Sequence, residues 1–201
     1  MRKLFFVFIG LCVSFCLYAQ KDGFVRQILE NTDLAIREAK GIHVIFSGTN
    51  QGTLLLSGDK FYLDCAGIIS WFDGKTQWSY VVETEEVTIT NPTKEELQGL
   101  NPYLLIQSFK EGYIYQYKGK TTYNGKRGHK LILIPEHEQT IKSITLFIAD
   151  NYLPYYIKID QMNGTTTEVQ VISCKTNQIF NDKVFKFDKK EFPDAEIIDL
   201  R

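Results

Sequence analysis

The feature that most constrains this chain is a long succession of short, strand-like runs separated by turn sequences. From residue 42 onward, runs rich in β-branched and aromatic residues alternate with turn dipeptides such as Asn124-Gly125 and Asn163-Gly164. The sequence therefore predicts an antiparallel meander. The expected strands are residues 42–47, 53–56, 61–65, 68–72, 77–82, 87–90, 113–118, 130–134, 144–148, 155–159, 168–173 and 184–187.

A helix is expected before the first strand. Between Phe24 and Ala39, apolar residues recur at three- and four-residue steps, as on one face of an amphipathic helix, and Gly41 would end it. The residues expected on the apolar face are Val25, Ile28, Leu29, Thr32, Ala35, Ile36 and Ala39.

A second helical segment interrupts the meander at residues 91–109. Thr93 and Glu96 have the spacing of a capping box, which predicts a short helix around residues 94–98. Asn101-Pro102 can begin another turn, which carries the apolar residues Tyr103, Leu104, Leu105 and Ile106. These elements predict a mainly β (α+β) fold with helices packed on one face of a long curved sheet.

The N-terminus has the form of a secretory signal peptide. Met1-Arg2-Lys3 precedes an apolar run that ends near Leu17, and Ala19 is a small residue suited to cleavage. We expect residues 1–19 to be removed and residues 20–201 to form one exported domain. Acylation at Cys16 is the alternative, but the preceding Phe15 is larger than lipoprotein processing prefers.

The charge of the mature chain excludes a basic footprint for nucleic acid. Loss of Arg2 and Lys3 lowers Lys+Arg from 23 to 21 against 24 Asp+Glu, which gives a net charge of about −3. Two cysteines, Cys65 and Cys174, remain after cleavage. A disulfide and two separate buried thiols are both open for them.

Strand parity groups the apolar side chains. Because alternate residues of a strand share a face, the apolar members of four runs are expected to line one continuous surface. This surface is either an ordinary core or a cavity for an apolar ligand. Its residues are Phe61, Leu63, Cys65, Trp78, Tyr80, Val82, Ile144, Leu146, Ile148, Phe185 and Phe187.

No catalytic or nucleotide-binding motif is complete. Gly74-Lys75-Thr76 resembles the end of a phosphate-binding loop, but Ile69 stands where its first glycine is required and a strand-like run follows. Asp73-Gly74 is instead expected to form a type I′ hairpin turn. His43 has no acidic or cysteine neighbour at metal-ligand spacing. His129 and His137 are expected to lie at the protein surface. We expect no enzymatic activity, no metal and no cofactor.

Several segments together resemble the outer-membrane lipoprotein carrier family LolA. They are Asp73-Gly74-Lys75-Thr76 with Trp78 and Tyr80, then EEVTI at 85–89, NPYLLI at 101–106, the hairpin sequence at 141–160 and the Phe-rich run with its Pro-containing tail at 167–199. Their order and spacing carry the resemblance, which covers nearly all of residues 24–199.

The resemblance implies an incomplete antiparallel β-barrel of about 11 strands, with the N-terminal helix and a short helical lid on its concave face. It implies a periplasmic chaperone that binds the acyl chains of outer-membrane lipoproteins, receives them from an ATP-driven extractor in the inner membrane and delivers them to an outer-membrane acceptor. We expect a monomer without cofactor. The residues assigned to the acyl-chain cavity are Leu29, Phe46, Leu54, Leu56, Leu63, Trp78, Tyr80, Tyr103, Leu104, Ile106, Leu146, Ile148 and Phe187.

One departure from the family leaves an alternative open. Where the family has an Arg-Pro step after the early Leu-rich strand, with the arginine implicated in lid closure, this chain has Leu56-Ser57-Gly58-Asp59. A related periplasmic lipid or lipopeptide binder or sensor without a carrier role is therefore the alternative. A lipid hydrolase is a third reading, which lacks a nucleophile-base pair in the sequence.

Overall fold

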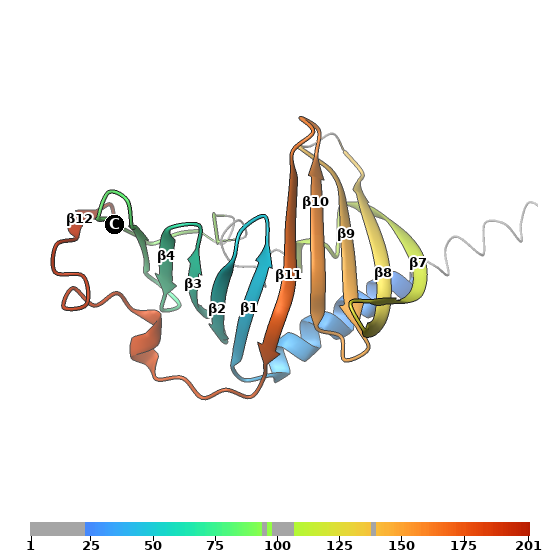
Figure 1. Ribbon diagram of the computed structural model, residues 1–201, viewed down its shortest axis with the longest axis horizontal. Coiled ribbons are helices and arrows are strands. Elements are labelled where there is room, and N and C mark those ends of the chain that lie inside the picture. Colours follow the sequence, from blue (N-terminus) through green and yellow to red (C-terminus); the bar gives the residue numbers. More distant parts are fainter. Residues whose placement is uncertain (1–22, 94–95, 98–106, 138–139) are drawn as a thin grey trace, which may run out of the picture. The chain divides into compact units, whose positions relative to one another are not determined.

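The computed structural model describes residues 23–93, 96–97, 107–137 and 140–201. These residues form a helix over 23–38 and twelve strands, which follow the hydrogen-bonded order β12-β6-β5-β4-β3-β2-β1-β11-β10-β9-β8-β7 (Figure 1). The strands are β1 (Ile42–Gly48), β2 (Gly52–Ser57), β3 (Lys60–Cys65), β4 (Ile68–Phe72), β5 (Gln77–Val81), β6 (Glu86–Thr90), β7 (Tyr113–Tyr123), β8 (Lys126–Pro135), β9 (Ile141–Ala149), β10 (Pro154–Gln161), β11 (Thr166–Lys175) and β12 (Glu196–Asp199).

The fold class predicted from the sequence is confirmed. The described strand pairs are antiparallel, except that β12 runs parallel to its partner β6. The order is open, since β12 stands at one end and β7 at the other. An open, mainly antiparallel sheet with an N-terminal helix is consistent with an incomplete β-barrel.

Near the C-terminus, one expectation was wrong and one strand was not expected. The expected strand at 184–187 is replaced by a single 3-10 turn, η1 (Asp182–Phe185), which Asn181 caps by accepting a hydrogen bond from the backbone N–H of Lys183. The last strand, β12, was not expected. It pairs in parallel with β6, and a parallel partner far away in the chain leaves no hairpin signal in the sequence.

Chain contacts divide the molecule into two compact units, which we describe separately. The first, here the β7–β10 unit, contains Phe109–Thr166 and the helix as far as Thr32. The second, here the β1–β6 unit, contains Asp33–Ser108 and Thr167–Arg201, and so includes β11 and β12.

In the β7–β10 unit, the helix covers one side of a four-stranded meander. Figure 1 shows β7, β8, β9 and β10 side by side. Phe24 of the helix makes edge contacts with Tyr117 and His129, and the Arg26 guanidinium lies 5.0 Å from the centre of the Tyr115 ring. These contacts place the helix on the side of the sheet that carries Tyr115, Tyr117 and His129.

In the β1–β6 unit, the cross-strand register separates the apolar residues into two faces. Residues directly opposite one another on neighbouring strands point to the same side of a sheet. Face A carries Ile42, Val44, Phe46, Leu54, Leu56, Phe61, Leu63 and Phe72. Face B carries Tyr62, Ile69, Trp71, Trp78, Tyr80, Val87 and Ile89.

Within the β1–β6 unit, backbone contacts fix the residues that follow the helix. Lys40 has a positive φ of 54°, and the backbone N–H groups of Asn177 and Gln178 donate to the carbonyls of Ala39 and Gly41 at 2.9 and 3.0 Å. A Cβ at Gly41 would lie 2.2 Å from the carbonyl oxygen of Gln178, so this approach requires glycine. Gly41 therefore marks the helix end, as expected from the sequence.

The Asp73-Gly74 turn differs from the expected type I′ geometry. Gly74 has a φ of +99°, but Asp73 is not among the described non-glycine residues with positive φ, and type I′ requires both. Instead, the Asp73 carboxylate accepts hydrogen bonds from the backbone N–H groups of Lys75 (3.1 Å) and Thr76 (2.9 Å). The turn is closed by this side chain.

Candidate ligand-binding surfaces

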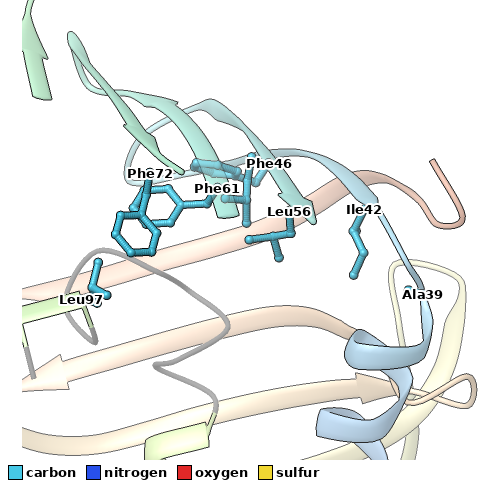
Figure 2. Packing of buried hydrophobic residues seen from close by; sticks show 8 residues of the cluster. Ala39, Ile42, Phe46, Leu56, Phe61, Phe72 and Leu97 are labelled. Atoms are coloured by element: carbon cyan, nitrogen blue, oxygen red, sulfur yellow. The ribbon is translucent and has the colours of Figure 1, made fainter. Parts of the chain in front are cut away.

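Face A carries an extended cluster of apolar side chains in the β1–β6 unit and is the first candidate site. Its core contains Ile42, Phe46, Leu54, Leu56, Phe61 and Phe72, together with Ala39 from the helix end and Leu97. Figure 2 shows the side chains of Phe61, Phe72 and Leu56 projecting from their strands toward one side, with Leu97 near Phe72. Apolar residues at alternate positions of β1, β2 and β3 thus form one continuous apolar face.

On β4, β5 and β6, face A also carries uncharged polar side chains. Ser70 pairs with Ser79, which pairs with Thr88, while Gln77 lies opposite Phe72. The Gln77 amide donates to Ser79 Oγ at 3.0 Å, and the hydroxyls of Ser70 and Ser79 lie 3.3 Å apart. Ser70 and Gln77 are 4% and 5% exposed. Hydroxyl and amide groups of this kind can hydrogen-bond an ester or amide of an amphiphilic ligand.

These hydroxyls have no partner that could activate them as nucleophiles. A serine nucleophile needs a general base within hydrogen-bonding distance. In the described part of the chain, the partners of Ser79 are Ser70 and Gln77, and neither is a base. His43 is opposite Leu55, on the same side as face B. The arrangement of these hydroxyl groups therefore does not support the interpretation of the protein as a lipid hydrolase.

Face B is already covered by the chain itself. The residues after η1, here the C-terminal segment (186–200), place Phe187 and Phe192 against Trp71, with ring centroids 5.6 and 5.5 Å apart. Phe192 also lies 4.7 Å from the ring centre of Tyr80. Ala195 is buried in the same cluster, and Lys186 Nζ lies 3.6 Å from the Asp73 carboxylate.

The structure divides the residues assigned to the acyl-chain cavity among several places. Phe46, Leu54, Leu56 and Leu63 come together on face A, with Leu63 packed at the margin of its core. Trp78, Tyr80 and Phe187 lie in the face B cluster, on the opposite side of the same strands. The expectation of one continuous apolar surface was therefore wrong within the β1–β6 unit.

The remaining assigned residues lie elsewhere. Leu29, Leu146 and Ile148 are in the β7–β10 unit and are at most 2% exposed. Leu146 pairs with Leu131, and Ile148 pairs with His129, so both lie on the side that the helix covers. Tyr103, Leu104 and Ile106 lie outside the described residues.

The start of the insertion follows the sequence expectation. The Glu96 carboxylate accepts from the backbone N–H of Thr93 at 2.7 Å, and the Glu96 N–H donates to the Thr93 hydroxyl at 3.3 Å. This reciprocal pair is a capping box, and it lowers the pKa of Glu96 chiefly through the Thr93 N–H. Leu97 follows within the turn and joins the core of face A.

His129 was expected at the surface and is instead 5% exposed. Its Nδ1 lies 3.0 Å from the Tyr117 hydroxyl, Phe24 meets its ring at an edge and Tyr152 stacks nearly parallel at 6.5 Å. Burial lowers the pKa of His129, and Lys120 lowers it further, while Asp150 opposes these effects. The alternating Tyr113, Tyr115 and Tyr117 on the neighbouring strand are the sequence signal for this aromatic environment.

A buried carboxylate in the helix was also not expected. Asp33 is 2% exposed, forms an ion pair with Arg37 one turn later and accepts a hydrogen bond from the Gln107 amide at 3.0 Å. Its spacing from Arg37 is the sequence signal. The contact with Gln107 joins the helix to the residues that follow the insertion.

Cys65 and Cys174 are not joined to each other by a disulfide bond. Both pack at the margin of the face A core, where Cys65 pairs with Gly52 on β2 and Cys174 with Val44 on β1. Two strands, β2 and β1, stand between them, and each strand spacing is about 4.8 Å, whereas a disulfide requires Cα atoms within about 7 Å. The reading as separate thiols is therefore the one that the structure supports.

Among the described residues, no group of three or more His, Cys, Asp and Glu side chains could hold a metal ion. Nor is any helix among them both long enough and apolar enough to cross a membrane.

Comparisons with known proteins place the fold and the family. The chain resembles an uncharacterized conserved protein from Thermus thermophilus, with a TM-score of 0.64, 12% identity and coverage of 88% of this chain and 99% of that one. It also resembles lipoprotein LppX of Mycobacterium tuberculosis, with a TM-score of 0.54, 12% identity and coverage of 80% and 98%. At these identities the likeness concerns the fold. No curated protein sequence matches the chain.

The sequence itself identifies the family. A family model described as outer membrane lipoprotein carrier protein LolA matches residues 15–163, which is most of the chain. The match includes the helix and β1 to β10, and so covers the strands that carry face A and face B. The chain therefore belongs to the LolA family of outer-membrane lipoprotein carrier proteins.

Proposed function

We propose that the protein is a periplasmic chaperone that binds the acyl chains of lipoproteins and carries them from the inner to the outer membrane. The observation that carries the proposal is face A, a continuous apolar face in a chain that belongs to a carrier family. Membership of this family supports lipid or lipoprotein binding in an extracytoplasmic compartment, and the family is one of carriers and not of enzymes.

Face A suits the chemistry of an acylated lipoprotein. Leu54, Leu56 and Phe61 offer the apolar contact that hydrocarbon chains require. Ser70 and Gln77 lie farther along the same face and can hydrogen-bond the ester and amide groups that join the chains to the protein. In this proposal the described part of face A forms one wall of the cavity.

The remaining cavity residues are proposed from the sequence. Tyr103, Leu104 and Ile106 follow the capping box of Thr93 and Glu96 in the chain, and we assign them to a lid. Leu29, Leu146 and Ile148 are assigned to apolar support in the β7–β10 unit. Trp78, Tyr80 and Phe187 lie in the face B cluster beside the C-terminal segment, so in this proposal they are not part of the face A wall.

The free energy of the acyl chains dictates how cargo must move. Burial contributes roughly 0.8 kcal/mol per methylene, so about 40 methylenes face a cost near 30 kcal/mol on exposure to water. That exceeds the ceiling of roughly 18 to 21 kcal/mol for non-covalent binding. Cargo must therefore pass directly from one apolar site to another, from an ATP-driven extractor to the carrier and from the carrier to an outer-membrane acceptor.

The test is a transfer assay. Purified mature protein is incubated with membranes that contain a labelled triacylated lipoprotein and the extractor with ATP, and the soluble fraction is examined for a complex. Acceptor membranes are then added, and the label is expected to leave the soluble complex without nucleotide in the carrier. Failure to form a soluble complex with any acylated protein would contradict the proposal.

Substitutions can separate the proposed lid from the general stability of the fold. Leu56→Asp on face A and Leu104→Asp in the proposed lid are expected to reduce lipopeptide binding. Leu104→Asp should leave the melting temperature nearly unchanged, whereas Leu56→Asp should lower it because Leu56 is 7% exposed. Equal losses of stability in the two variants would contradict the assignment of Leu104 to a lid.

A periplasmic lipid or lipopeptide binder or sensor is the second candidate function. The turn Ser57-Gly58-Asp59-Lys60 stands where the family has the arginine implicated in lid closure, so that latch is not available in this chain. The alternative predicts that free lipid or lipopeptide binds well while no cargo moves to acceptor membranes. Mass spectrometry of any apolar molecule that copurifies with the protein distinguishes the two candidates further.

A further inference from the structure

The β7–β8 hairpin carries a concentration of positive charge that the proposed function does not use. Between Gly112 and Pro135 there are five cationic side chains and no Asp or Glu, although the whole chain has a net charge of −1. The five are Lys118, Lys120, Lys126, Arg127 and Lys130.

The register shows which of these charges share a side of the sheet. Lys126 lies opposite Tyr123 on β7, and Lys130 lies opposite Phe147 on β9. Phe147 in turn lies opposite Tyr156 on β10. Residues 129 and 131 alternate with residue 130, so this side faces away from the one that the helix covers. We call Tyr123, Lys126, Lys130, Phe147 and Tyr156 the Lys-Tyr patch.

Aromatic contacts make the Lys-Tyr patch a defined surface. The Tyr123 ring lies 4.8 Å from Tyr156 and 5.7 Å from Phe147, measured between ring centroids. Lys126 Nζ lies 4.0 Å from the centre of the Tyr155 ring. Phe147 is buried, Tyr123 and Tyr156 are half-buried, and Lys126 and Lys130 are exposed. The Lys126 ammonium thus lies on an aromatic ring, and Lys130 is exposed on the same side of the sheet.

We propose that the Lys-Tyr patch docks on the surface of a bilayer that contains anionic phospholipids. Lysine heads are attracted to the negative surface potential of such a bilayer, and Tyr rings have an apolar body and a polar tip, which suit the boundary between headgroups and acyl chains. The patch combines both features on one side of the four neighbouring strands β7, β8, β9 and β10.

The same features argue for a bilayer over other anionic partners. Nucleic acid is disfavoured because the chain as a whole is acidic. An acidic protein would complement Lys126 and Lys130, but a bilayer also provides the headgroup boundary that half-buried Tyr123 and Tyr156 prefer. The inference goes beyond the proposed function and does not require cargo, because the patch is built from residues outside face A.

The experiment measures binding of the unloaded mature chain to lipid vesicles by flotation. Vesicles of phosphatidylcholine alone are compared with vesicles that also contain phosphatidylglycerol. We expect binding only to the anionic vesicles and a decline with added salt, because the interaction of exposed charges is screened. The double variant Lys126→Glu with Lys130→Glu is expected to bind at least about tenfold more weakly.

Two further variants make the result specific. The single variant Lys130→Glu leaves Lys126 on the Tyr155 ring and should also weaken binding. It replaces the double variant in the comparison if thermal melting shows that the double variant folds poorly. Lys183→Glu with Lys190→Glu makes the same change in net charge at exposed lysines of the β1–β6 unit and should bind as the unmodified protein does.

The proposal is overturned if both vesicle types bind equally or if the Lys183 and Lys190 control loses as much binding as the patch variants. It is also overturned if a soluble acidic polypeptide binds the patch while anionic vesicles do not, an outcome that would assign the surface to an acidic protein. Lipopeptide binding without vesicles is measured for every variant. Loss there with intact vesicle binding would contradict the carrier proposal and leave this one standing.

Discussion

At the scale of single residues, His129 couples the stability of the β7–β10 unit to pH. Its side chain is surrounded by Tyr117, Phe24 and Tyr152, and the charged groups nearest to it in this unit are Lys120 and Asp150, which pair with each other at 3.1 Å. Burial holds the pKa of His129 below its ordinary value of 6.5. The folded protein therefore favours neutral His129.

The sign of the pH dependence follows from this shift. As the pH falls through 6.5, the unfolded chain takes up the proton before the folded protein does, so the free energy of unfolding decreases until the pH reaches the lower pKa of the folded state. We expect His129→Asn to lose less stability than the unmodified protein between about pH 7.5 and pH 5.5. Urea unfolding at both pH values measures the difference.

The role of His129 is refuted if His129→Asn and the unmodified protein lose equal stability over this pH interval.

Leu146 tests how strictly the helix-covered side of the β7–β10 unit must remain apolar. The residue is 2% exposed, and Leu146→Asp would bury an unpaired charge, so we expect the free energy of unfolding to fall by roughly 3 to 5 kcal/mol. Ile114→Asp is the control, because Ile114 lies on β7 and is 54% exposed. Its cost should remain below about 1 kcal/mol. Similar costs at both positions would contradict the assignment of sides.

Residue-level expectations from the sequence succeeded where the chain alone determines the contact. The Thr93–Glu96 capping box depends on residues three apart, and it is present as expected. The faces of Trp78 and Phe61 depend on the cross-strand register, which strand parity alone does not contain. The burial of His129 likewise depends on Phe24, more than a hundred residues earlier in the chain.

At the scale of elements, the C-terminal segment is a separate layer on face B. Its aromatic residues Phe187 and Phe192 stack on one another with centroids 5.6 Å apart and contact Trp71. β12 then pairs with β6, and all four of its residues are exposed. The attachment of β12 therefore relies on backbone pairing and on the rings that precede it.

Phe192→Ala tests that reliance. Removal of a packed Phe side chain costs about 3 kcal/mol, and we expect the loss to fall on the C-terminal segment. Amide exchange of β12 should accelerate and tryptophan fluorescence should change, because Phe192 contacts Trp71, while amides of β2 retain their protection. Ile179→Ala, at a residue that is 99% exposed, is the control and should change neither measurement. Uniform loss of protection in β12 and β2 would show that the segment is not a separate layer.

Most elements could be predicted because alternation and turn chemistry are local. Eleven expected runs correspond to β1–β11, although β7 and β8 extend several residues farther toward Asn124-Gly125 than their apolar residues indicate. Val184 and Phe185 resemble a strand but lie in a 3-10 turn, since the Asn181 cap and the burial of Phe185 outweigh β propensity.

At the scale of the whole molecule, maturation can be tested directly. The exported protein is expected to begin at Gln20, because Ala19 suits cleavage and Phe15 disfavours lipid attachment at Cys16. Intact-mass measurement of the protein recovered from the periplasm checks this start. A diacylglyceryl addition on Cys16 would contradict it and would place the protein at a membrane by covalent anchoring.

The pairing of β12 with β6 has a consequence for the order in which the protein can be made. The hydrogen-bonding edge of β6 is synthesised before β7 to β11, and its parallel partner becomes available only after all five have followed. Throughout that interval β6 presents unpaired backbone groups, a state in which strands join wrong partners. A chain that pauses in synthesis or export between residues 90 and 196 is thus the species most open to mispairing at this edge.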